Sequence, residues 1–327
     1  MNRSVKISRA VAIVLVAVIA MSSTAGAVHG SAVAAAAPGA RKSTMVWMGL
    51  EITGENVSLD LQSISVHRSD LTGVSYEHYL LGSQGYFGTV LSLTNVTGNI
   101  KSFGLQTYPM IISTNLGDME YVIQHHSNFI SRAVAKAVGA GYTGYNIDFE
   151  PTQTANASVG KAYASFLTTF ADALHAKGKK LTVDIATWNP FWNFAALANT
   201  TVDVLYDMST YASPAYNFDA ALGYANETIP HSKLGVGLIT VNVNNGAVLL
   251  NYSVNARFIA LESDGVQNVA VWDMPLASYW WPYLHQFIGP GKVSSGNTPA
   301  IEYAAAATAL AALAAVAVFL VLRRKRS

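Results

Sequence analysis

The chain has 327 residues, of which 51% are hydrophobic and only 12% are charged, and its formal net charge at pH 7 is +1. A charge this close to zero gives no electrostatic basis for binding nucleic acid. The sequence contains no cysteine, which excludes disulfide bonds, thiolate metal sites and a cysteine nucleophile.

The N-terminal segment has the pattern of a secretory signal peptide. Three basic residues lie before an apolar run at 10–21, and small residues follow this run. The run is too short for a comfortable membrane span, although an uncleaved anchor is the alternative. We expect residues 1–37 to form a signal peptide and a small-residue segment, with cleavage near Ala27 or within 34–37.

Between residues 43 and 289, apolar runs typical of strands alternate with helical stretches such as 59–70, 118–139, 160–177 and 278–287. The expected strands lie at 44–50, 71–81, 106–113, 144–150, 181–188, 202–211, 234–239 and 269–274. Eight strands with interleaved helices over roughly 250 residues predict a single (β/α)8 TIM barrel of the α/β class. A doubly wound open sheet is the alternative, but no G-x-G-x-x-G motif follows an early strand.

The stretch 144–151 carries the most informative polar residues. Apolar residues alternate there with Asn146, Asp148 and Glu150, so these three side chains should stand in one row. Asp148 and Glu150 would lie about 6.6 Å apart at Cα. Two carboxylates this close raise the pKa of one of them, which suits a general acid. A solvated edge strand is the alternative, but the helical sequence on both sides favours a covered strand whose acids line a site.

The C-terminal segment has the pattern of a membrane anchor. Residues 290–302 form a linker rich in glycine, serine and proline, and 303–322 is an apolar run long enough to span a bilayer as a helix. The basic tail 323–327 should stay on the cytoplasmic side. Six N-x-[ST] sequons between residues 56 and 251 also favour export. We therefore expect a monomeric domain at the cell surface, held by a single C-terminal transmembrane helix.

Residues 143–150, T-G-Y-N-I-D-F-E, resemble the D-G-x-D-x-D-x-E signature of glycoside hydrolase family 18, the chitinase family. Gly144, Asp148 and Glu150 match this signature, whereas Thr143 and Asn146 stand where its first two aspartates are usual. The last two acids, which carry the chemistry of the family, are both present. The resemblance implies a (β/α)8 barrel whose active site lies at the C-terminal ends of the strands.

Two further stretches extend the resemblance. Residues 269–273 are similar to the eighth strand of the family, whose tryptophan floors the sugar pocket, and this tryptophan would be Trp272. Residues 203–211 resemble the sixth strand, usually M-x-Y-D, although Met208 and Tyr211 are one residue further apart here. Each of these residues also has a purely structural interpretation. Trp272 and Tyr211 could be core packing residues, Asp207 could cap a turn, and Trp188 could be an aromatic residue on the outer surface.

The resemblance implies hydrolysis of β-linked N-acetylglucosamine glycans by retaining, substrate-assisted cleavage, with no metal or cofactor. Glu150 would protonate the glycosidic oxygen, while the 2-acetamido carbonyl of the substrate attacks the anomeric carbon. Asp148 would hold the acetamido N–H and stabilise the oxazolinium, and Tyr211 would orient the carbonyl. Trp272 would stack under the sugar, and the further substrate-binding candidates are Asn146, Asp207, Trp188 and Met208. The alternatives are a chitinase-like glycan-binding protein without turnover and a structural protein of the cell envelope.

Overall fold

The computed structural model describes residues 42–49, 57–89 and 95–289. The expected signal peptide, linker, transmembrane helix and basic tail lie outside these described residues. Within the described ranges, no helix is both long enough and apolar enough to cross a membrane.

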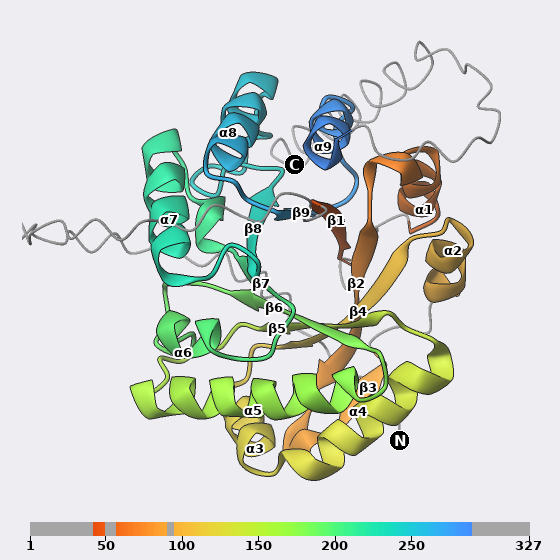
Figure 1. Cartoon of the computed structure of the whole chain (residues 1–327), viewed down its shortest axis with the longest axis vertical. Helices are drawn as coiled ribbons and strands as arrows, with labels where there is room; N and C mark the ends of the chain where they lie inside the picture. The colour runs from red at the N-terminus through yellow and green to blue at the C-terminus, as the bar shows by residue number, and fades with distance from the viewer. Residues whose placement is uncertain (1–41, 50–56, 90–94, 290–327) are drawn as a thin grey trace, which may run out of the picture. The chain divides into compact units, whose positions relative to one another are not determined.

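The described strands form a closed parallel barrel (Figure 1). Neighbouring strands pair in parallel around the ring, and β1 pairs with both β9 and β2, which closes it. The eight barrel strands are β1 (Ser43–Met48), β2 (Gly73–Leu81), β4 (Gln106–Ser113), β5 (Gly144–Phe149), β6 (Lys180–Ile185), β7 (Val204–Asp207), β8 (Leu234–Ile239) and β9 (Asn268–Trp272). The predicted (β/α)8 barrel is therefore confirmed, and the open sheet is excluded. One short strand, β3 (Phe87–Thr89), adds to β2 in antiparallel orientation.

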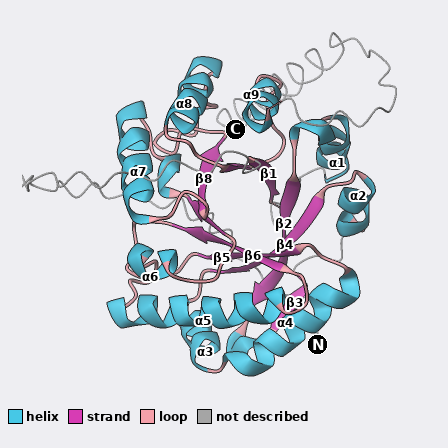
Figure 2. Cartoon of the chain, in the orientation of Figure 1, coloured by secondary structure: helices cyan, strands magenta, loops and turns pink. Residues whose placement is uncertain are grey.

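Helices cover the outside of the barrel (Figure 2). They are α1 (Val57–Val66), α2 (Val96–Ser102), α3 (Leu116–Gln124), α4 (His126–Ala140), α5 (Ala157–His175), α6 (Phe194–Ala198), α7 (Ala215–Thr228), α8 (Asn251–Ser263) and α9 (Trp280–Ile288). The expectation of one helix over 118–139 is wrong, because α3 and α4 are separate. The backbone leaves helical geometry at His125, which has φ −123° and ψ 39°, and the next helix begins one residue later.

The strands divide the apolar side chains into two clusters. On β5, Tyr145, Ile147 and Phe149 belong to the large cluster between the barrel and the helices. The Tyr145 hydroxyl donates to the carbonyl oxygen of Ala133 on α4 at 3.0 Å. A smaller cluster fills the barrel interior, and we call it the interior cluster; its buried members are Met45, Trp47, Tyr108, Met110, Ile112, Tyr206 and Ala270. On β1 and β4, alternate residues therefore face this interior.

Candidate active site

Strand β5 points one row of polar side chains into the barrel. Asn146 is fully buried, whereas Asp148 and Glu150 are half-buried toward the C-terminal end of the strand. The strand begins at Gly144, where an added Cβ would lie only 2.1 Å from the carbonyl oxygen of Lys180 on β6. Glycine alone permits this approach, so the glycine of the signature lets β5 and β6 come together at the start of the polar row.

Glu150 follows β5 directly and is held by its backbone. Its N–H donates to the carbonyl oxygen of Ser113 on β4 at 2.8 Å. The chain just beyond it is fixed by the buried side chain of Asn189, whose Nδ2 donates to the carbonyl oxygens of Pro151 (3.2 Å) and Gln153 (2.9 Å). Burial raises the pKa of Glu150. A carboxyl group with a raised pKa can keep its proton near neutral pH, which is the property that a general acid needs.

A third carboxyl group, Asp184, reaches the same space from β6. Asn146 donates a hydrogen bond from Nδ2 to Asp184 Oδ2 and accepts one from the Thr182 hydroxyl. Burial raises the pKa of Asp184 well above its ordinary value; the hydrogen bond from Asn146 lowers it and the charge of Glu150 raises it. Asp184 is not among the residues predicted from the sequence. The alternation of Leu181, Thr182, Val183 and Asp184 is the signal that could have placed it on the interior face.

Tyr211 reaches the carboxyl groups from the loop after β7. It ends the short 3-10 helix η3 (Ser209–Tyr211) and packs against the interior cluster. Burial raises the pKa of Tyr211 well above its ordinary value, and the charges of Asp184, Glu150 and Asp148 raise it further. The phenol therefore stays protonated, and it can donate a hydrogen bond beside three carboxyl groups.

Arg257 on α8 fixes the loop that carries Tyr211. Its guanidinium donates from Nη1 to the carbonyl oxygen of Thr210 at 2.8 Å and from Nη2 to that of Ala212 at 2.9 Å. The same group lies over the ring of Phe218, 4.6 Å from the ring centroid. Burial lowers the pKa of Arg257 to about 10, so the side chain remains charged at neutral pH. Arg257 is not among the residues predicted from the sequence, because nothing near it in the chain indicates this contact.

Trp272 closes the same space from the end of β9. Its half-buried ring packs against the interior cluster, as the ring of Tyr211 does. Gly237 on β8 makes room for the aromatic side chains, because an added Cβ would lie 3.1 Å from Tyr211 Cε1 and 3.4 Å from the ring of Trp47. Beyond Trp272, burial raises the pKa of Asp273 to about 6, and the charge of Asp60 adds to this rise.

Solved structures with the same fold are chitinases and related enzymes. A chitinase from Chromobacterium violaceum ATCC 12472 has a TM-score of 0.64 at 14% identity, over 76% of this chain and 99% of that chain. The spore cortex-lytic enzyme SleL of Bacillus megaterium QM B1551 has a TM-score of 0.64 at 13% identity, over 76% and 74%. The GH18 chitinase ChiB of Flavobacterium johnsoniae has a TM-score of 0.57 at 12% identity, over 76% and 94%.

The barrel has the chitinase-like fold of glycoside hydrolase family 18. No protein-family model matches the chain, and no curated protein matches it either. The identities to these solved structures are 12–14%, so the likeness is one of fold.

Not every residue proposed from the sequence faces the barrel interior. Asp207 shares the outward alternation of Leu205, and its Oδ1 accepts from the backbone N–H of Ser209 at 2.9 Å. Met208 is buried in the cluster between the barrel and the helices. Trp188 is 41% exposed and lies edge-on to Trp192, with ring centroids 5.5 Å apart. The structure thus groups Asn146, Asp148, Glu150, Tyr211 and Trp272, and the binding roles of the other three stay predictions.

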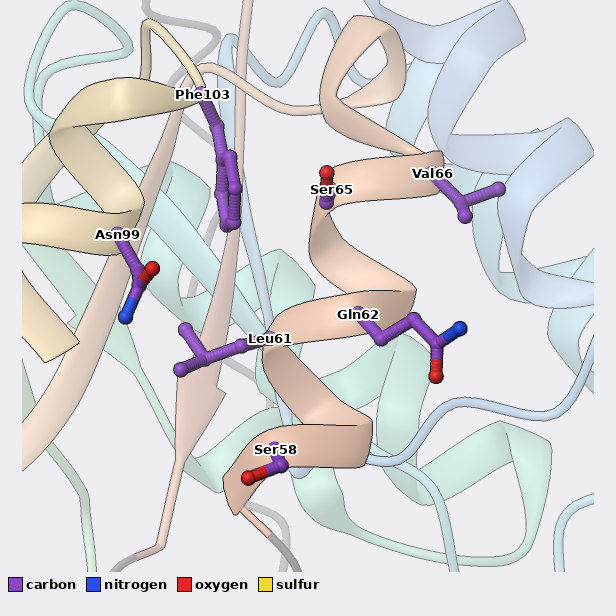
Figure 3. Close-up of a pocket in the computed structure, with 7 residues that line it drawn as sticks. All are labelled: Ser58, Leu61, Gln62, Ser65, Val66, Asn99 and Phe103. Carbon is purple, nitrogen blue, oxygen red and sulfur yellow. The ribbon is translucent and has the colours of Figure 1, made fainter. Parts of the chain in front are cut away.

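A surface groove on the outside of the barrel lies apart from this group. It has a volume of about 410 Å³ and lies between α1 and α2, where Leu61 and Phe103 face each other (Figure 3). Its lining residues are Ser58, Leu61, Gln62, Ser65, Val66, Asn99 and Phe103. These side chains offer hydroxyl, amide and apolar groups but no titratable group for acid–base chemistry. Across the described ranges, no group of three or more histidine, cysteine, aspartate or glutamate residues could hold a metal ion.

Proposed function

We propose that the barrel hydrolyses β-linked N-acetylglucosamine glycans, namely chitin, chito-oligosaccharides or related glycoconjugates. The observation that carries this proposal is the position of Glu150, a carboxyl group with a raised pKa directly after β5. Asp148 stands two residues before it on the same face, and the phenol of Tyr211 lies beside both. The chitinases among the structural neighbours support the choice of substrate class.

The residues present fit retaining, substrate-assisted cleavage. Glu150 donates its proton to the glycosidic oxygen as the bond to the anomeric carbon breaks, and the carbonyl oxygen of the substrate's 2-acetamido group forms the new bond. Asp148 accepts the acetamido N–H and stabilises the positive charge of the oxazolinium. A water molecule then attacks the anomeric carbon and gives a proton to the Glu150 carboxylate, which restores the acid.

Tyr211 and Trp272 position the sugar in this scheme. The Tyr211 phenol, which keeps its proton, donates to the acetamido carbonyl and so orients it for attack. Trp272 offers an aromatic face at the end of β9, and such faces pack well against the apolar face of a sugar ring. Neither residue exchanges a proton with the substrate.

We also propose that the barrel works outside the cell. The apolar run at 303–322 with its basic tail, and the signal-like segment at 1–37, support export and anchoring. Protease treatment of intact cells that express the full chain should remove the barrel. A barrel that survives this treatment, yet is digested after lysis, would mean that it lies inside the cell.

The substitution Glu150→Gln tests the function, because it keeps the shape of the side chain and removes the transferable proton. General acid catalysis contributes roughly 10²–10⁴-fold, so turnover of chito-oligosaccharides should fall at least by this range. Binding of a thiazoline mimic of the oxazolinium should persist, because the pocket is unchanged. The matched control is Glu227→Gln on the exposed face of α7, which should leave both measurements unchanged.

Two outcomes of this experiment would count against the proposal. Near-native turnover in Glu150→Gln would show that Glu150 is not the general acid. A wild-type protein that binds chito-oligosaccharides but releases no product would instead identify the barrel as a glycan-binding protein.

A further inference from the structure

Asp273 is a half-buried carboxyl group at the mouth of the barrel that the cleavage scheme does not use. It follows β9 directly, as Glu150 follows β5, so both residues lie at the C-terminal ends of their strands. In the closed ring, β8, β7 and β6 separate β9 from β5 on one side, and β1, β2 and β4 separate them on the other. Asp273 therefore lies across the mouth from Glu150, on the side that Trp272 occupies.

The backbone on both sides of Asp273 is fixed by hydrogen bonds. The carbonyl oxygen of Trp272 accepts from the backbone N–H of Thr240, which follows β8, at 2.8 Å. The N–H of Met274 donates to the carbonyl oxygen of Trp47 on β1 at 3.1 Å. Asp273 is thus held between the two strands that flank β9. A binding group on a backbone that is already ordered loses less conformational freedom when a ligand arrives.

The carboxyl group of Asp273 has no counter-ion in the protein. Across the ranges that the structure describes, no lysine, arginine or histidine forms an ion pair with it, and no other side chain hydrogen-bonds to it. Burial raises its pKa to about 6, and the charge of Asp60, a buried residue in the first turn of α1, adds to this rise. Asp273 is therefore mostly ionised at neutral pH. A partly buried charge without a partner favours a ligand of opposite charge.

The charge of Asp273 reaches the space in which the reacting groups lie. Tyr211 follows β7, which lies midway between β5 and β9 in the ring. The charges that raise its pKa beyond the effect of burial are those of Asp184, Glu150, Asp148 and Asp273. No basic group of the described residues contributes to this shift, so the electrostatic potential around the phenol is negative. A sugar that carries a positive charge would gain charge-assisted hydrogen bonds there.

The cleavage scheme requires an acetamido group on one sugar only. The unit whose glycosidic bond breaks must be acetylated, because its acetamido carbonyl oxygen forms the new bond. The units beside it have no such requirement. A unit with a free 2-amino group is largely an ammonium ion near neutral pH, and an ammonium group offers three donors to a carboxylate.

We propose that Asp273 is a specificity-determining residue: its carboxylate binds the free 2-amino group of a glucosamine unit next to the reacting N-acetylglucosamine, so that the barrel prefers partly de-N-acetylated glycans to fully acetylated chitin. This inference deepens the proposed hydrolysis and rests on it for the position of the reacting sugar. Asp273 accepts hydrogen bonds from the ammonium group and takes no part in breaking the glycosidic bond.

The experiment offers acetylated and partly de-N-acetylated substrates to the same proteins near neutral pH. The variants are Asp273→Asn, Asp273→Ser and the control Glu227→Gln, which lies exposed in the last turn of α7, at the opposite end of the barrel. The first readout is the identity of the sugar units on both sides of each cut in partly de-N-acetylated chitosan, determined by mass spectrometry of the products. The second is calorimetric binding of a fully acetylated and a partly de-N-acetylated oligosaccharide of equal length, measured in the Glu150→Gln background, where turnover is slow.

The proposal predicts a preference that depends on the charge at position 273. With the wild type, the units next to the reacting sugar should contain more glucosamine than the chitosan does on average. The partly de-N-acetylated oligosaccharide should bind about tenfold more tightly than the acetylated one, and added salt should reduce this ratio. Both preferences should disappear in Asp273→Asn and persist in Glu227→Gln. A merely structural role for Asp273 would weaken the binding of both oligosaccharides by the same factor.

The two readouts separate this inference from the proposed function. A wild-type protein that cuts neither substrate, or that cuts at glucosamine units, overturns the proposed function, while the binding ratio still judges Asp273. Equal binding of both oligosaccharides without a substitution at position 273, or a ratio that is unchanged in Asp273→Asn, overturns the inference. If Asp273→Asn does not fold, Asp273→Ser decides, because it also removes the charge: loss of the preference supports the proposal, and a preserved preference contradicts it.

Discussion

Removing the guanidinium of Arg257 should loosen the loop that carries Tyr211. The substitution Arg257→Met keeps an unbranched stem that can still pack over Phe218, but it removes the donors to the carbonyl oxygens of Thr210 and Ala212. These two carbonyl groups lie on either side of Tyr211 in the chain. The variant should therefore lose stability and should also misplace the Tyr211 phenol.

The expected loss of stability follows from the two hydrogen bonds. A hydrogen bond to a charged group contributes about 1.5–3 kcal/mol, which gives an upper range of about 3–6 kcal/mol for the pair. Arg257 is only 5% exposed, so removing its buried charge offsets part of this loss. We expect a net loss of about 3 kcal/mol, which lowers Tm by about 6–12 °C in a domain of this size. A misplacement of about 1 Å at a positioning residue can cost about 10²-fold in rate, so kcat/KM should fall by this order.

The assay pairs thermal unfolding with kcat/KM on a chito-oligosaccharide at a temperature where the variant is folded. The control is Arg132→Met, since Arg132 on α4 also donates to a backbone carbonyl, that of Gly85 at 2.7 Å, and lies over Phe87. This control should lose about half as much stability, because one such bond is lost, and keep its kcat/KM. An Arg257→Met variant that loses stability but keeps wild-type kcat/KM would refute the reasoning that links this contact to Tyr211.

Two further predictions concern a buried acid and two tryptophans. Burial raises the pKa of Asp207 from 3.8 to about 7, so the folded state binds a proton that the unfolded state releases, and stability falls as pH rises between these values. Asp207→Asn should remove this fall and gain up to about 4 kcal/mol relative to the wild type at pH 8, measured by urea unfolding at pH 5 and pH 8; an equal pH dependence in both proteins would contradict it. Trp272→Ala should weaken binding of a short chito-oligosaccharide about tenfold, whereas Trp188→Ala, at an exposed position, should change it less than about twofold. Calorimetry measures the affinity of both tryptophan variants, and a larger loss in Trp188→Ala than in Trp272→Ala would mean that Trp188, and not Trp272, stacks on the sugar.

Much of the fold could be predicted because the barrel strands are apolar runs bounded by residues that end a strand. The seventh predicted strand, 234–239, coincides with β8 (Leu234–Ile239). The sixth was expected over 202–211, yet β7 ends at Asp207, because the chain turns into η3 and is held there by Arg257 from a distant helix. Such a contact leaves no local pattern. The three-residue strand β3 was not among the expected strands, since it is too short to show alternation.

The site was predictable to the extent that it lies on one strand. The alternation around Asn146, Asp148 and Glu150 correctly indicated a row of polar side chains facing the interior. No role could be assigned to Asp184 from the sequence, because its contact with Asn146 depends on the register of β6 against β5 and on the direction of the Asn146 amide. Asp207 was grouped with Tyr211 because they were expected on one strand, whereas the turn at η3 separates their side chains.

The most direct test of the account is a comparison of matched chito- and cello-oligosaccharides with the same preparation of the protein, following the anomer of the first product by NMR. Substrate-assisted catalysis makes the 2-acetamido group of the substrate the nucleophile, and glucose oligomers lack this group. The account predicts cleavage of the chito-oligosaccharide with retention of the β anomer, and no cleavage of the cello-oligosaccharide. Comparable cleavage of both, or an initial α product, would show that an enzymic nucleophile or an activated water does the chemistry, and would contradict the role assigned to Asp148.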